Sequence, residues 1–197
     1  MPFRRLIVVA AAASLLAGCG INSVPTKEEA AKAKWADVQA AYQRRADLIP
    51  NLVETAKGAA QIEQSTLEGV IQARASATQV KLDAGELSDP AKVEAFRQAQ
   101  GNVSSALSRL LVTVEQYPQL QSQGRFADLM TQLEGTENRI TTAVGDYNRA
   151  VQDYNTTIRT FPDIIGAKVI HGAEPMKTFE AITPNANVAP KVDFGTK

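Results

Sequence analysis

The chain has 197 residues, enough for one domain of ordinary size and too few for a second large one. It carries 21 basic and 21 acidic side chains, and this balance argues against nucleic acid as a partner, because phosphate binding needs a basic surplus. A single His and a single Cys exclude a zinc site of Cys and His ligands, a Cys-His dyad and an internal disulfide. We therefore expect no metal site and no cofactor.

The first residues have the organisation of an export signal. A short cationic segment with Arg4 and Arg5 precedes an apolar run from Leu6 to Leu16. That run is too short for a bilayer, which needs about 20 apolar residues. It leads into the sequence Leu-Ala-Gly-Cys, which resembles a bacterial lipobox, the motif after which signal peptidase II cleaves. We expect residues 1–18 to be a lipoprotein signal peptide.

Cys19 would then be the lipidated N-terminus of the mature protein, followed by a linker that ends at residue 25. Two or more acyl chains hold a protein stably on a membrane, at about 0.8 kcal/mol per buried CH₂. Gly20, in place of Asp, resembles the outer-membrane sorting signal of Gram-negative lipoproteins. The expected location is the extracytoplasmic face of the envelope, facing the periplasm from the outer membrane if the cell is Gram-negative. The alternatives are a cysteine that lies by chance in a signal peptide, or an uncleaved anchor.

The first helix of the domain is expected to begin at Thr26, because Thr26 and Glu29 have the spacing of a capping box. Pro50 should kink this helix rather than end it. A helix continuing to residue 83 would be roughly 87 Å long and would leave much of its apolar face without a partner. We therefore expect a break near Gly58, although a seven-residue register continues through it.

A second helical stretch begins at Asp89-Pro90, which has the pattern of an N-cap followed by an N1 proline. Its apolar positions alternate in steps of three and four, which indicates a heptad row, and Pro118 should end it. One member of the row is polar. The row consists of Val93, Phe96, Gln100, Val103, Leu107, Leu110, Val114 and Tyr117.

The last helical stretch shows a strict seven-residue repeat that predicts a left-handed packing row. The repeat consists of Phe126, Leu133, Ile140, Tyr147, Tyr154 and Phe161, with a companion row of Met130, Glu137, Val144, Val151 and Ile158. Pro162 should stop this helix. Together the stretches predict an all-α, antiparallel up-and-down bundle of four helices over residues 26–162. Residues 163–197 should form an irregular C-terminal tail that is partly docked and otherwise flexible.

Several sequence blocks together resemble one family of bacterial envelope proteins, the LemA family. They are WADVQAAYQRRADLIPNLVE from Trp35, LEGTENRI from Leu133, the two Tyr-Asn pairs at 147 and 154, and Phe161-Pro162. The resemblance implies a mostly helical, membrane-attached, extracytoplasmic domain and carries over no reaction. The chain departs from the family in having a lipobox where many members have a transmembrane helix. It also has Ile62-Glu63 where a His-Glu pair is frequent.

A group of charged and amide side chains could form either a polar network inside the bundle or a recognition site for a carboxylate or phosphate. We favour the network, because interhelical ion pairs are the commoner use of such residues. Glu137 falls in an apolar row, so it should be buried and need a cationic partner. Asn148 and Asn155 lie on one stripe and could either cap a polar row or fix register, as buried Asn does in coiled coils. The group consists of Arg44, Arg45, Asp47, Asn51, Glu134, Glu137, Asn138, Arg139, Asn148 and Asn155.

Two classes of function remain. In the first, the protein is non-enzymatic and its bundle is a scaffold or docking surface at the membrane, for an envelope protein or a second copy of the chain. In the second, it is a sensor or hydrolase that uses a hidden arginine or carboxylate site. We favour the scaffold, because the sequence contains no motif of known catalytic mechanism.

Overall fold

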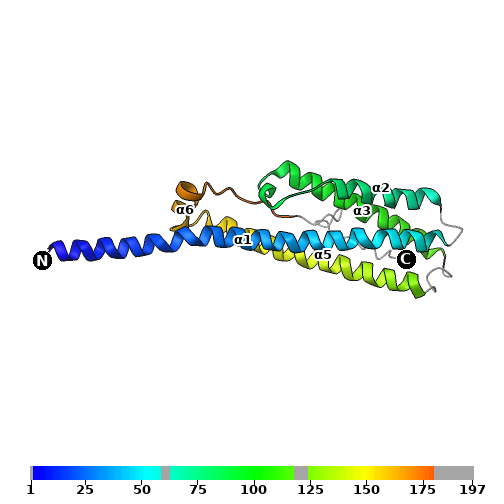
Figure 1. The fold of residues 1–197 in the computed structure, drawn as a ribbon, viewed down its shortest axis with the longest axis horizontal. Helices are drawn as coiled ribbons and strands as arrows, with labels where there is room; N and C mark the ends of the chain where they lie inside the picture. Colours follow the sequence, from blue (N-terminus) through cyan, green and yellow to red (C-terminus); the bar gives the residue numbers. More distant parts are fainter. Residues whose placement is uncertain (1, 59–62, 118–123, 180–197) are drawn as a thin grey trace, which may run out of the picture.

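The computed structural model describes residues 2–58, 63–117 and 124–179, and their side chains from Asn22 onward. Four principal helices share one long axis (Figure 1): α1 (Pro2–Lys57), α2 (Gln64–Gln79), α3 (Pro90–Glu115) and α5 (Gly124–Thr157). Successive helices run in opposite directions, with α1 packed mainly on α5 and α2 mainly on α3. No strand occurs within these described ranges. The predicted all-α, antiparallel up-and-down bundle is confirmed.

The predicted start of the first helix at Thr26 is wrong, because α1 is continuous from Pro2. Thr26 does not cap a helix, since its hydroxyl donates to the carbonyl oxygen of Asn22, one turn earlier, at 2.7 Å. The reason lies in the packing, because Val24 is completely buried in the bundle core and extends the packed part of α1 upstream of Thr26. The expected linker before residue 26 is therefore helical.

At its other end α1 passes through Pro50 and stops at Lys57. The predicted break near Gly58 is confirmed. This break allows α2 to turn back and pack Leu67 and Val70 into the same core as Leu52 and Val53 of α1.

Between α2 and α3, a short 3₁₀ helix η1 (Ala84–Glu86) lies in the segment that reverses the chain beside α1. Asp89 then caps α3 as predicted, because its carboxylate accepts hydrogen bonds from the backbone amides of Ala91 and Lys92 and Pro90 occupies the first helical position. The helix ends at Glu115, and the predicted stop at Pro118 lies outside the described residues.

The seven-residue repeat of α5 is buried from Phe126 to Tyr154, but its predicted last member, Phe161, is not. The helix ends at Thr157, four residues earlier than the repeat suggested, and Phe161 lies in the turn that follows. A repeat in the sequence keeps its side chain on the core face only while the backbone remains helical.

Aromatic rings form the centre of one half of the core. Trp35 lies between Phe96, Tyr147 and Phe179, with ring centroids 5.3–5.8 Å apart, and its indole nitrogen donates to the carbonyl oxygen of Leu82 at 2.9 Å. These tilted and edge-on contacts are the geometries that aromatic pairs prefer. Phe179 belongs to the C-terminal tail, so the tail completes the core.

The predicted irregular tail begins in helical form. After α5 come the short helix α6 (Asp163–Gly166) and a π-helical turn, η2 (Ala167–His171), which ends at Gly172 in the left-handed conformation. Residues 172–179 then run along the bundle without regular secondary structure. The rest of the predicted tail, 180–197, lies outside the described residues.

Candidate functional site

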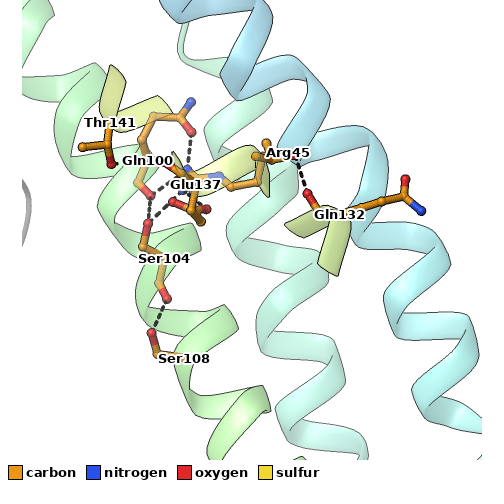
Figure 2. Close-up of polar contacts among 8 residues, drawn as sticks. Arg45, Gln100, Ser104, Ser108, Gln132, Glu137 and Thr141 are labelled. Atoms are coloured by element: carbon orange, nitrogen blue, oxygen red, sulfur yellow. Dashed lines mark hydrogen bonds and ion pairs between the residues drawn. The ribbon is translucent and has the colours of Figure 1, made fainter. Parts of the chain in front are cut away.

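Arg45 on α1 is the centre of a polar network inside the bundle (Figure 2). Its side chain is only 2% exposed. One guanidinium nitrogen donates to the Ser104 hydroxyl at 2.9 Å and to the Glu137 carboxylate at 3.1 Å. The other donates to the backbone and side-chain carbonyl oxygens of Gln100 at 3.1 and 2.8 Å. The planar guanidinium therefore joins α1 to α3 and α5 through four bonds.

The Tyr42 ring adds a further contact, with its centroid 5.0 Å from the Arg45 guanidinium carbon. Burial raises the pKa of the Tyr42 phenol to about 12, the Arg45 charge opposing that shift and the Glu137 charge adding to it. The Tyr42 side chain therefore stays uncharged at any physiological pH, and its ring packs against the network.

The expectation that Glu137 is buried is wrong, because its side chain is 43% exposed. At this level of α5 its row lies at the edge of the core, where the neighbouring members Met130 and Val144 are also half-buried, although Val151 and Ile158 farther along are buried. The carboxylate therefore pairs with Arg45 and keeps contact with water. Of the two charged groups in this pair, only the Arg45 guanidinium is buried.

The other members of the predicted group lie elsewhere. Arg44 is exposed and donates to Gln132 at 3.2 Å, and Asp47 accepts a bond from Gln43, one turn earlier on α1. The remaining four are exposed on α1 or α5, namely Asn51, Glu134, Asn138 and Arg139. The structure thus brings together Arg45 and Glu137 and leaves the other members of this part of the group at the surface.

Sequence reasoning missed Gln100 and Ser104 as partners of Arg45. The signal for Gln100 was present, since it is the polar member of an otherwise apolar row and its side chain is 7% exposed. A buried amide needs hydrogen-bond partners, and a buried guanidinium on the facing helix supplies them. No pattern in the sequence marks Ser104.

Asn148 and Asn155 of α5 hold the tail against the bundle. Each side-chain amide makes two hydrogen bonds to the backbone of one tail residue, Asn148 to Phe179 at 2.7 Å and Asn155 to Met176 at 2.8–2.9 Å. In each pair the side-chain nitrogen donates to the carbonyl and the side-chain oxygen accepts from the amide. We call these two pairs the asparagine clamp.

The tyrosines that precede these asparagines bind the same segment. The Tyr147 hydroxyl donates to the carbonyl oxygen of Lys177 at 2.8 Å, and the Tyr154 hydroxyl donates to that of Glu174 at 3.1 Å. On the other side, the amide of Lys177 donates to the carbonyl oxygen of Leu87. The two Tyr-Asn pairs therefore bind the backbone of the tail. The asparagines, which were candidates for fixing helix register, hold the tail instead.

Burial raises the pKa of Tyr147, as it does that of Tyr42. The Tyr147 phenol therefore stays protonated and can donate its hydrogen bond to the tail, which a phenolate could not do.

The raised pKa values predict how the stability of the protein depends on pH. A group whose pKa is raised on folding contributes its full stabilisation below its unfolded pKa, near 10, and loses it as the pH rises through the folded value. We therefore expect the free energy of unfolding to fall between about pH 10 and pH 12, by about 2 kcal/mol from Tyr42 alone. Urea unfolding at several pH values measures this fall, and Tyr42→Phe should reduce it. An equal fall in that variant would contradict this account.

The cavity beside the network is small. It lies between α1, α2 and α3, has a volume of about 200 Å³ and is lined by Tyr42, Arg74 and Phe96 among others. Pockets for small organic ligands usually have roughly 300–1,000 Å³. An open polar groove of about 700 Å³ lies on the outer face of α5, beside the clamp, and is bordered by Arg149, Gln152 and Arg159.

Within the described ranges, no cluster of three or more His, Cys, Asp or Glu side chains could bind a metal ion. Over the same residues, none of the helices combines the length and the apolar character that crossing a bilayer requires.

The comparison with known families matches residues 34–194 to the LemA family. The chain belongs to the LemA family. The matched region contains both the Arg45 network and the asparagine clamp, so both are features of this chain's LemA domain.

Three curated relatives are magnetosome proteins. MamQ 2 and MamQ 1 of Paramagnetospirillum magneticum are each 34% identical to this chain over 173 residues, covering 80% of this chain and 63% of the relative. MamQ of Magnetospirillum gryphiswaldense is 30% identical over 157 residues, covering 72% of this chain and 58% of the relative. The chain thus spans less than two thirds of the length of these relatives.

Proposed function

We propose that this LemA protein is a non-enzymatic envelope lipoprotein, attached to the membrane through Cys19, whose bundle is a scaffold for a protein partner. The observation that carries the proposal is the use of the Arg45 guanidinium inside the bundle. Its four bonds to α3 and α5 commit this guanidinium, the one cation that is buried among the described side chains, to the fold. A ligand carboxylate or phosphate would have to displace these partners.

The geometry of α1 supports the membrane attachment. The helix leads without a break from the apolar run at residues 6–16 into the core at Val24 (Figure 1). Lipid on Cys19 would therefore sit one to two turns from the packed domain and hold it close to the bilayer. The magnetosome relatives are in keeping with a protein that works at a membrane.

The open groove on α5 is the surface that we assign to the partner. Its side chains are polar and charged, as at the rims of transient interfaces, and the docked tail forms its border at Thr178. A photo-crosslinking residue at Gln152, in this groove, should give a discrete adduct in cells. The same residue at the exposed Gln72 of α2 is the matched control.

Cys19→Ala should abolish incorporation of labelled palmitate and move the protein from the membrane fraction to the soluble fraction, because the acyl chains supply the attachment. The measurements are metabolic labelling and fractionation of cells that express the full chain. Unchanged labelling in the variant would end the lipoprotein proposal. Loss of labelling with full membrane retention would show that the uncleaved N-terminal segment can hold the variant at the membrane by itself.

A further inference from the structure

Four large apolar side chains lie exposed in the short segment after α5. Phe161 is 80% exposed, Val169 79%, and Ile165 and Ile170 56% each. We call these four residues the apolar patch. Only two other large apolar side chains are exposed within the described ranges, Ile71 and Val112, and they lie on other helices.

In this segment the burial pattern is the reverse of that in an ordinary surface helix, where large apolar side chains face the core. Its small residues Gly166 and Ala167 are buried against the bundle, while Ile165 and Val169, one turn apart, face outward. Exposing large apolar side chains while burying small ones costs stability. A concentrated patch of this kind marks a surface that is covered in the working protein.

The position of the patch identifies what covers it. The helix α6 packs on α1, where the Ser23 hydroxyl donates to the Asp163 carboxylate, and Ala167 shares a core cluster with Val24. Cys19 is four residues upstream of Ser23, which is about 6 Å along a helix. Figure 1 shows α6 at the end of the bundle where the N-terminal part of α1 leaves it.

Two basic side chains accompany the apolar patch, and one exposed carboxylate, that of Glu174, follows it in the chain. Arg159 and Lys168 are both exposed and flank the apolar side chains. The one carboxylate inside the segment, Asp163, faces Ser23. Basic residues beside an apolar face are typical of segments that lie in the membrane interface, with cations at the level of the phosphates and apolar side chains below them.

We propose that the apolar patch is a second membrane contact, which inserts into the interfacial layer of an anionic bilayer next to the lipid on Cys19. This proposal rests on the proposed lipid anchor. The anchor keeps the patch close to the headgroups, so insertion is an intramolecular step that needs little affinity of its own. Two contacts fix the orientation of the bundle, so that its long axis points away from the membrane.

The test uses the full chain, purified from bacterial membranes after processing and placed in vesicles of phosphatidylethanolamine and phosphatidylglycerol. Val169→Trp introduces an indole into the patch, and Val112→Trp introduces one at an exposed position near the C-terminal end of α3, at the opposite end of the bundle. The wild-type protein, whose one tryptophan is the buried Trp35, gives the background. Flotation measures attachment, and bromine atoms on the upper acyl-chain carbons quench any indole at that depth.

We expect the protein to float in all forms. The added emission of Val169→Trp should shift to the blue and fall by more than about half on brominated lipid, since interfacial segments are buried by about 5–10 Å. Val112→Trp should keep its emission. Ile165→Trp repeats the test at a second position, and circular dichroism verifies the bundle in each variant.

Other results separate the two proposals. Flotation without bromine quenching at either patch position would overturn the membrane contact and leave the anchor in place. Failure to float would overturn both, because nothing would then hold the patch at a bilayer. A blue shift that is independent of lipid, together with a larger oligomer in sedimentation, would assign the patch to a protein interface and overturn the proposal.

Discussion

Arg45→Ala is expected to lower the free energy of unfolding by about 3 kcal/mol, through the lost packing of its buried side chain and the polar groups left without a partner. The variant removes a side chain that is 2% exposed and leaves a cavity between α1, α3 and α5. It also leaves the Gln100 amide, 7% exposed, without its main partner. An unsatisfied buried polar group costs about 1–3 kcal/mol by itself. Urea unfolding followed by circular dichroism measures the change.

Arg44→Ala is the matched control. Arg44 is the neighbouring arginine of the same helix, but it is exposed and makes a single bond, to Gln132. Its removal should change the free energy of unfolding by no more than about 0.5 kcal/mol. Equal and small effects of both variants would contradict a structural role for Arg45 and favour a recognition site.

Glu137→Ala should cost less than Arg45→Ala, about 1 kcal/mol, because an ion pair with one solvated partner is screened by water. The Glu137 side chain is 43% exposed, and in the variant Arg45 would keep its bonds to Gln100 and Ser104. The sequence alone suggests the opposite order of stability losses, because the position of Glu137 in an apolar row predicts that it is the more buried partner. A double-mutant cycle on Arg45 and Glu137 gives the coupling between them.

The helical rows could be predicted because packing imposes a period on the sequence. Phe126, Leu133, Ile140, Tyr147 and Tyr154 recur every seven residues and are all buried in α5. The same periodicity showed that Gln100 is a polar member of the apolar row of α3, but it did not identify Arg45 as the partner of Gln100. Periodicity assigns a residue to a face of its own helix, and it carries no information on which residue of another helix lies opposite.

The errors arose where tertiary contacts override a local pattern. The capping-box pattern at Thr26 is genuine in the sequence, but the buried Val24 keeps the helix continuous past it. Phe161 continues a repeat that the backbone has already left at Thr157. The sequence predicts a partly docked tail, but the residues that hold it could not be predicted, because the asparagine clamp binds backbone groups and so imposes no pattern on the tail sequence.

Replacing both clamp residues, in Asn148→Ala/Asn155→Ala, is expected to release the tail from α5. The variant deprives Met176 and Phe179 of partners for both their amide and carbonyl groups. A loss of about 2 kcal/mol in the local opening free energy would make their amides exchange roughly 30-fold faster, since each 1.4 kcal/mol is a factor of ten. Hydrogen exchange of these two amides is the direct measurement.

The rate of tryptic cleavage after Lys177 is a second readout. This side chain is exposed, but its backbone is bonded on both sides, to Tyr147 and to Leu87, so the docked segment cannot enter a protease active site. Cleavage should be faster in the double variant. Asn138→Ala, an exposed asparagine on the same helix, should leave both exchange and cleavage at their wild-type values.

Asn148→Asp distinguishes the two halves of one clamp pair. The carboxylate keeps an acceptor for the Phe179 amide but loses the donor to the Phe179 carbonyl. Exchange of the Phe179 amide should therefore lie between the wild-type value and that of Asn148→Ala. If exchange is unchanged even in the double alanine variant, the burial of the Phe179 ring beside Trp35 and Tyr42, together with the tyrosine hydroxyls, holds the tail. In that case the two asparagines would have no part in keeping it docked.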